Sequence, residues 1–175
     1  MKRFLLILTL VSSASIAIHS SEPSGPWALV FSLQDVLSTD AFIDGYQAGA
    51  GLKYRLSPDL DLRGLLGIDH NANAGVTRTV LGFGTALEWH FSEGSVSPYA
   101  GPLTGARMLF ETGQPGRVDL YFGALFGAEI KVAGPLYLFA EYDLVASFDA
   151  DGFTVRLGIP SGGLAGAQAG FIVRF

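Results

Sequence analysis

Residues 78–91 read RTVLGFGTALEWHF, and they indicate a β-strand because successive residues alternate between two chemical classes. Side chains that alternate at every second residue point to opposite faces of a β-strand. The first face comprises Thr79, Leu81, Phe83, Thr85, Leu87, Trp89 and Phe91, and the second comprises Arg78, Val80, Gly82, Gly84, Ala86, Glu88 and His90. One face is therefore uncharged and mostly apolar, whereas the other holds every charged residue and both glycines.

From residue 27 onward the chain divides into eight segments of this kind, joined as consecutive hairpins. Tight turns follow residues 56, 91 and 132, and longer loops cover about 35–45, 70–77, 111–118 and 149–162. Short turns at one end and longer loops at the other are typical of a membrane β-barrel. We therefore predict an all-β fold over residues 25–175, an eight-stranded antiparallel up-and-down transmembrane β-barrel.

The composition of the 175-residue chain agrees with this architecture. It is 49% hydrophobic and only 15% charged, with 23 glycines and no cysteine. Soluble domains carry about 25% charged residues, yet no apolar run after residue 20 reaches the ~20 residues that a spanning helix needs. A closed barrel resolves this conflict, because it satisfies every backbone hydrogen bond in lipid without a helix.

Residues 1–20 have the pattern of a secretory signal peptide. Lys2 and Arg3 precede an apolar stretch that begins at Phe4, and small residues follow it. We place the cleavage site between residues 17 and 24. Without Lys2 and Arg3, nine basic and sixteen acidic residues remain, a net charge of −7. An acidic chain of this kind argues against nucleic-acid binding, which needs a clustered basic face.

The charged strand face is predicted to point into the barrel. Its charges balance, seven positive against seven negative, as a narrow and partly desolvated lumen requires. Glycines on the same face leave room for larger luminal side chains. We therefore expect a luminal ion network. Its basic members are Lys53, Arg55, Arg63, Arg78, Arg107, Lys131 and Arg174, and its acidic members are Asp61, Asp69, Glu88, Asp119, Glu129, Glu141 and Asp143.

Aromatic residues of the apolar face gather near the strand ends, as in the two aromatic girdles of membrane barrels. With periplasmic termini, the periplasmic girdle comprises Trp27, Tyr54, Trp89, Phe91 and Phe175, and the outer girdle comprises Tyr46, Phe110 and Phe148. The general preference of aromatic residues for strands is an alternative explanation of these positions.

The signal peptide and the segments SPYAG (97–101), LFAEY (138–142) and FIVRF (171–175) resemble those of OmpA/OmpX-type outer-membrane barrels of Gram-negative bacteria. The resemblance extends over the barrel domain only. It implies a location in the cell outer membrane and contact with its lipid. The last strand, with Phe171, Val173 and Phe175, resembles the signal read by the outer-membrane assembly machinery, which is therefore an expected partner.

Two arrangements of possible catalytic or metal-binding residues carry little weight. His90 and Ser92 match the histidine–x–serine pattern of lipid A deacylases, which are also eight-stranded barrels. Strand counting places both residues at the periplasmic end, whereas those enzymes act on the outer leaflet, so we expect His90 to be a luminal hydrogen-bonding residue. His70 lacks a second histidine or cysteine for a metal site. We expect no catalytic residue, metal or cofactor.

The sequence predicts a monomeric barrel with a plugged lumen and a role in envelope integrity or surface interaction. Three alternatives stay open: a narrow pore for small solutes, a lipid-modifying barrel enzyme and a soluble lipocalin-like binder. The last requires the apolar strand face to line a cavity and the charged face to meet water.

Overall fold

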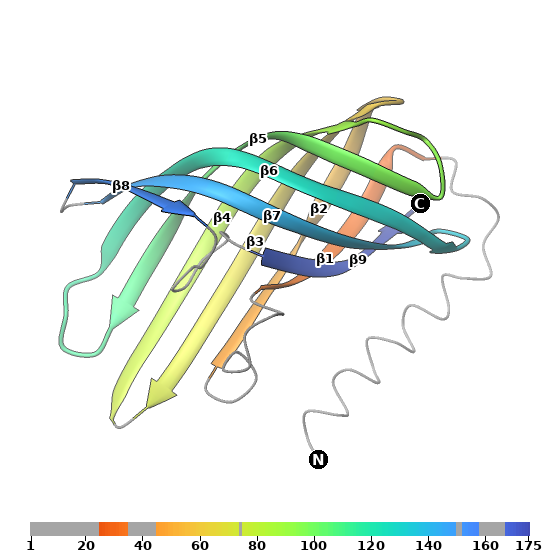
Figure 1. Cartoon of the computed structure of the whole chain (residues 1–175). Coiled ribbons are helices and arrows are strands. Elements are labelled where there is room, and N and C mark those ends of the chain that lie inside the picture. Colours follow the sequence, from red (N-terminus) through yellow and green to blue (C-terminus); the bar gives the residue numbers. More distant parts are fainter. Residues whose placement is uncertain (1–24, 35–44, 74, 150–151, 158–166) are drawn as a thin grey trace, which may run out of the picture.

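The computed structural model describes residues 25–34, 45–73, 75–149, 152–157 and 167–175 (Figure 1). The predicted signal peptide lies outside these residues. Among them, no helix is long and apolar enough to cross a membrane. The strands are β1 (Trp27–Gln34), β2 (Gly45–Ser57), β3 (Leu60–Asn73), β4 (Val76–His90), β5 (Val96–Glu111), β6 (Arg117–Ala133), β7 (Leu136–Asp149), β8 (Gly152–Leu157) and β9 (Ala167–Arg174).

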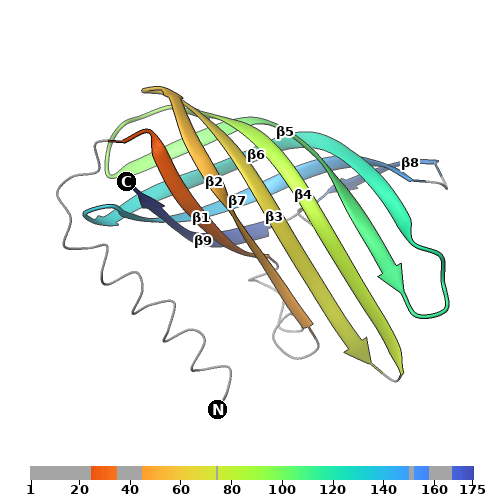
Figure 2. The ribbon, with the colours of Figure 1, turned by 180° about the vertical axis from the view of Figure 1, so that it is seen from behind.

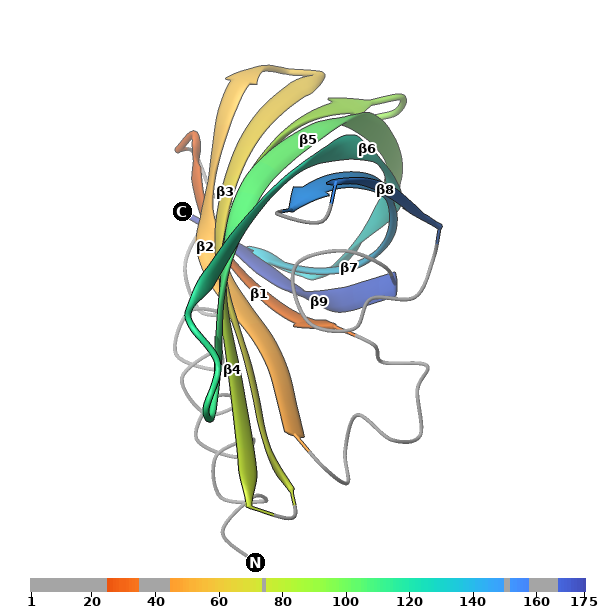
Figure 3. The ribbon, with the colours of Figure 1, turned by 90° about the vertical axis from the view of Figure 1, so that its left-hand side faces the viewer.

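These strands form one closed antiparallel sheet. From β1 to β7, each strand pairs with its neighbours along the chain. β9 closes the barrel because it pairs with β7 along one edge and with β1 along the other. Figures 1 and 2 show the wall from two sides, and Figure 3 looks into the curved sheet. The predicted eight-stranded up-and-down barrel is confirmed, with nine strands in eight positions.

The eighth position is shared by β8 and β9. Residues 136–142 of β7 pair with β9, whereas residues 144–149 pair with β8. The predicted loop over 149–162 is therefore wrong for residues 152–157. Asp149 pairs directly with Gly152, so the β7–β8 hairpin continues the ladder beyond the predicted end of this strand.

The hairpins at the end of the barrel opposite Gly25 and Phe175 are longer than predicted. The expected loop over 70–77 is wrong, since β3 and β4 remain paired as far as Asn73 and Val76, and Gly75 adopts a φ of 85° in the tight turn. The expected loop over 111–118 shrinks to residues 112–116. About 10 residues suffice for a tilted strand to cross a bilayer. The 15, 16 and 17 residues of β4, β5 and β6 are therefore more than such a crossing requires.

The two faces of the barrel wall differ as the alternation predicts. Lys53 and Glu88 are fully buried inside the barrel, whereas Leu66 and Phe83 on the outer face are 65% and 51% exposed. A soluble lipocalin-like binder would have its apolar face inside. The structure therefore contradicts that alternative.

Inner-face glycines provide space for luminal aromatic rings. A Cβ atom placed on Gly127 would lie 2.6 Å from the Tyr99 ring, so only glycine fits beneath it. The same cross-strand arrangement, aromatic residue opposite glycine, occurs three times along the inner face. The pairs are Tyr99 with Gly127, Tyr121 with Gly105, and Phe139 with Gly170.

Aromatic side chains mark the end of the barrel that carries both termini of the described chain. Trp27 on β1 pairs with Tyr54 on β2, and their ring centroids are 4.6 Å apart. Trp89, Phe91 and Phe175 are 49%, 70% and 56% exposed at the same end. At the far end Phe110 and Phe148 are exposed on the outer face, whereas the side chain of Tyr46 lies outside the described structure.

Candidate functional site

Lys53 is the centre of the buried charge network. It points inward from β2 and is 1% exposed. Its ammonium group forms ion pairs with Asp61 of β3 at 3.2 Å and with Glu88 of β4 and Glu129 of β6. Carboxylates from three strands therefore converge on one cation, which offsets their burial.

Arg63 forms the second branch of the network. Its two Nη atoms donate to the two carboxylate oxygens of Glu141, on the opposite wall, at 2.8 and 2.6 Å. This bidentate geometry is the strongest form of an arginine–carboxylate contact. Its Nε atom lies 3.0 Å from Glu88, which therefore joins Arg63 to Lys53. The Tyr99 hydroxyl also donates to Glu141, at 2.7 Å.

Arg174 and Gln168 bring the last strand into the network. Arg174 Nη2 contacts Asp61 at 3.2 Å and Glu129 at 2.9 Å. The Gln168 amide donates to Glu141 at 2.5 Å and to Asp143 at 2.9 Å. The network therefore joins strands from both ends of the chain across the lumen.

A second, smaller ion cluster lies on β5 and β6. Arg107 Nε donates to Asp119 at 2.7 Å, and Arg117 Nε lies 3.2 Å from the other oxygen of the same carboxylate. The sequence pattern placed Arg117 in a loop, whereas it begins β6 and pairs with Asp119.

The remaining predicted members lie nearer to solvent. Arg55 is 43% exposed, and its Nε atom contacts Asp61 at 3.3 Å. Lys131 is exposed and Arg78 is half-buried. The side chain of Asp69 lies outside the described structure.

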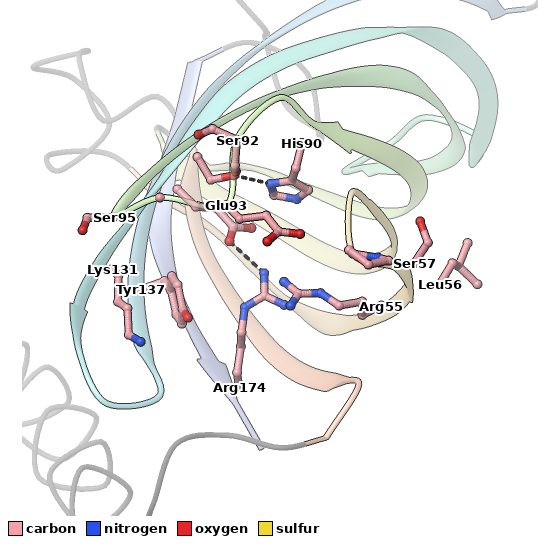
Figure 4. Close-up of a pocket in the computed structure, with 14 residues that line it drawn as sticks. Arg55, Leu56, Ser57, His90, Ser92, Glu93, Ser95, Lys131, Tyr137 and Arg174 are labelled. Atoms are coloured by element: carbon pink, nitrogen blue, oxygen red, sulfur yellow. Dashed lines mark hydrogen bonds and ion pairs between the residues drawn. The ribbon is translucent and has the colours of Figure 1, made fainter.

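One end of the lumen is a cavity of about 780 Å³, which we call the vestibule (Figure 4). It opens at the end that carries the β2–β3 and β4–β5 turns, and the Lys53 cluster lies beneath its floor. On the other side of the network, a cavity of only about 20 Å³ lies among Arg63, Tyr121 and Asp143. The network therefore separates the two spaces. Polar and basic residues that line the vestibule include Arg55, His90, Ser97, Lys131, Tyr137 and Arg174.

His90 connects the vestibule wall to the network. Its Nδ1 lies 2.8 Å from the Ser97 hydroxyl and its Nε2 lies 3.3 Å from Asp61. The Ser97 hydroxyl donates to the Ser92 carbonyl at 2.5 Å, so its oxygen is free to accept from His90. A serine nucleophile needs the opposite polarity, with its proton given to histidine. The Ser92 hydroxyl donates to the Val96 carbonyl, so the His90–Ser92 pair considered from the sequence does not form.

The network also brings together four residues whose side-chain atoms could ligate a metal ion. The sequence pattern did not predict that these four residues would lie side by side. Ligating atoms of Asp61, Glu88, His90 and Glu129 lie within 4.8 Å of one another. Such oxygen and nitrogen donors suit a divalent cation. The Lys53 ammonium already contacts all three of these carboxylates. Together with Arg63 at Glu88 and Arg174 at Asp61 and Glu129, Lys53 therefore supplies three positive charges beside the three carboxylates of this cluster.

Comparison with known proteins relates the fold of the chain to that of a bacterial surface protein. No protein-family model matches the chain, and no curated protein sequence matches it. Neisserial surface protein A (NspA) aligns with a TM-score of 0.54 and 18% identity over 85% of this chain and 94% of its own. Two structures from work on designed transmembrane β-barrels have TM-scores of 0.40 and 0.37, each with 17% identity, and cover 87% and 89% of this chain and 98% of their own. The likeness to NspA shows a shared barrel fold, and membership of an OmpA/OmpX-type family stays a prediction.

Proposed function

We propose that this protein is an integral outer-membrane barrel with a plugged lumen, and that it has a structural or surface-interaction role in the cell envelope. The observation that carries the proposal is the inverted distribution of side chains. Charged residues such as Lys53 and Glu88 are buried, while large apolar residues such as Leu66, Phe83 and Phe126 are exposed on the wall. Burial of such side chains in lipid is favourable by roughly 25 cal/mol per Å² of apolar surface.

The ion pairs support a closed lumen. An eight-stranded barrel is just wide enough to be filled by its own side chains. Lys53 reaches Glu129 from β2 to β6, and Arg63 reaches Glu141 from β3 to β7. These contacts span the interior, and a solute could pass only by separating buried ion pairs.

We propose that the protein is exported and then folded into the membrane by an assembly machinery. Phe31 and Phe171 stack on adjacent strands with ring centroids 4.8 Å apart, and Phe175 is 56% exposed. We propose that Phe171, Val173 and Phe175 are the assembly signal and that residues 1–20 are the export signal. The proposal includes a monomeric state and no catalytic role. The Ser97 hydroxyl donates to the Ser92 carbonyl, so this residue is not arranged as a nucleophile that gives its proton to His90.

Membrane fractionation tests the proposal. The protein should partition with the outer membrane, and the folded barrel should migrate differently on gels before and after boiling. A soluble species whose migration does not change with heating would refute the membrane location. Removal of residues 1–20 should leave the chain in the cytoplasm if they are the export signal.

A narrow pore is the second candidate function, because the vestibule reaches the network from one end of the lumen. Single-channel recording in planar bilayers distinguishes the two candidates. A plugged barrel gives no conductance steps, whereas reproducible steps from the unmodified protein would favour the pore. Loss of those steps on substitution of vestibule residues would place the permeation path in this lumen.

A further inference from the structure

Asp143 is a luminal carboxylic residue without a cation beside it in the described part of the chain. It lies on the inner face of β7 and is 2% exposed. Gln168 donates to its Oδ2 atom at 2.9 Å, and no basic side chain that the structure describes forms an ion pair with it. Its Oδ1 atom is buried and has no hydrogen-bond partner among those residues. An ionised Asp143 would therefore keep its charge in the lumen without the partner that burial requires.

A second carboxylate shares the amide group that holds Asp143. Gln168 Nε2 also donates to Glu141, at 2.5 Å, two residues earlier on the same face of β7. Arg63 does not balance both residues, because its Nη atoms contact Glu141 and its Nε atom lies 3.0 Å from Glu88. An ionised Asp143 would add a negative charge beside Glu141, and like charges repel strongly at low dielectric.

The charged and titratable side chains around Asp143 come from four described strands. They are Arg63 of β3, Glu88 of β4, Tyr121 of β6 and Glu141 of β7. β5 and β9 contribute the uncharged Leu103 and Gln168 to the same space, and Arg107 of β5 is paired with Asp119. Arg156 of β8 lies opposite Val145 in the ladder, and its side chain lies outside the described structure. Arg63 is therefore the one cation among the four described groups.

A proton meets both conditions that these contacts set, a positive charge and almost no volume. The cavity of about 20 Å³ that Asp143 lines has room for a single water molecule, which would leave the charge of a carboxylate in place. Asp143 Oδ1 has no surface open to this cavity, so a metal ion has no room against it. Gln168 Oε1 is a further buried atom without a partner in the described structure, and it is an acceptor on the side chain that already contacts Asp143.

We propose that the folded barrel binds one proton at Asp143, which is an uncharged carboxylic acid at neutral pH. The proton allows Asp143 and Glu141 to share the Gln168 amide, which joins β7 to β9 at a strand pair that closes the barrel. An aspartate of the unfolded chain ionises with a pKa of about 4. Folding therefore takes up a proton above that pH. The equilibrium constant for unfolding should rise with pH, by up to about tenfold per pH unit, until the folded protein also releases the proton.

Infrared spectroscopy of the folded mature protein in detergent micelles at neutral pH tests for this proton directly. A protonated carboxyl group gives a carbonyl stretching band separate from the bands of carboxylates, and Asp143→Asn should remove that band. Asp119→Asn is the matched control, because Asp119 is 1% exposed but contacts Arg107 and Arg117. It should leave the band unchanged.

Urea unfolding in the same micelles from about pH 5 to about pH 8 tests the link to folding. Asp143→Asn has no proton to release on unfolding, so its stability should rise relative to that of the unmodified protein as the pH increases. The ratio of the two unfolding constants should change by up to about tenfold per pH unit. Asp119→Asn should be less stable than the unmodified protein by an amount that does not vary over this range, because it loses ion pairs of a carboxylate that is charged throughout.

Three results would overturn the proposal. The first is the absence of a protonated-carboxyl band in the unmodified protein, which would mean that Asp143 is ionised, as it would be if Arg156 supplied its cation. The second is a band that persists in Asp143→Asn, which would place the proton on another group. The third is a ratio of unfolding constants that does not change with pH. The infrared measurement on the unmodified protein does not require the variant to fold. Neither measurement depends on which membrane holds the barrel, so both can fail independently of the proposed function.

Discussion

Replacement of Lys53 by methionine tests whether the luminal network stabilises the barrel. The substitution keeps a long side chain of similar volume, so the effect of a new cavity is small. It removes the single ammonium group that contacts Asp61, Glu88 and Glu129. All three carboxylates are at most 2% exposed and cannot be rehydrated without opening the lumen.

The magnitude follows from the partners that stay in place. Glu88 keeps Arg63 at 3.0 Å, and Glu129 keeps Arg174 at 2.9 Å. Loss of one partner from a buried ion pair costs about 3–5 kcal/mol. Because these carboxylates each retain a cation, we expect Lys53→Met to lower the free energy of unfolding by about 3 kcal/mol, the lower end of that range.

Equilibrium unfolding by urea in lipid vesicles measures this change. Trp27 and Trp89 report on it, since both lie on the outer face with 45% and 49% exposure and would leave the lipid on unfolding. Arg55→Met is the control, because the Arg55 side chain is 43% exposed and its Nε atom lies 3.3 Å from Asp61. A pair of this kind contributes at most about 1 kcal/mol.

Equal and small losses of stability in Lys53→Met and Arg55→Met would show that the buried ion pairs of Lys53 do not stabilise the barrel. A double-mutant cycle with Glu88→Gln provides a second check. Removal of the negative charge of Glu88 should recover part of the stability lost in Lys53→Met, because the uncompensated carboxylate is then gone. Strict additivity of the two substitutions would show that Lys53 and Glu88 are not coupled.

Three further substitutions test other parts of the wall and the lumen. Leu66→Arg places a charge at the middle of β3 on the outer face, where Leu66 is 65% exposed, and should destabilise the barrel in vesicles by about 2–4 kcal/mol in urea titrations. Gly127→Val should cost about 1–3 kcal/mol in the same assay, because its Cβ would clash with the Tyr99 ring; a neutral result would contradict the close packing of the inner face. Arg63→Lys should also destabilise the barrel although it keeps the charge, since lysine cannot reproduce the bidentate contact with Glu141, and stability equal to that of the unmodified protein would argue against that geometry.

The sequence pattern predicted the barrel architecture correctly, but it predicted the ends of several strands wrongly. Alternation in segments such as residues 78–91 identified the wall and the inward face correctly, because it depends only on the two-residue repeat of a strand. The predicted loops were wrong for residues 70–73, 76–77 and 152–157, because the polar and glycine residues there also fit strands. Arg117 was assigned to a loop for the same reason.

The strand alternation alone showed that charged side chains share one face of the wall, because the two-residue repeat is a local property of each strand. It did not determine their partners. Arg174 meets Asp61 across 113 positions of sequence, and Arg63 meets Glu141 across 78. Such contacts depend on the register of every intervening strand pair and on closure by β9, which only the tertiary structure specifies. The convergence on Lys53 and the vestibule that Arg55 and Arg174 share are therefore properties of the closed barrel.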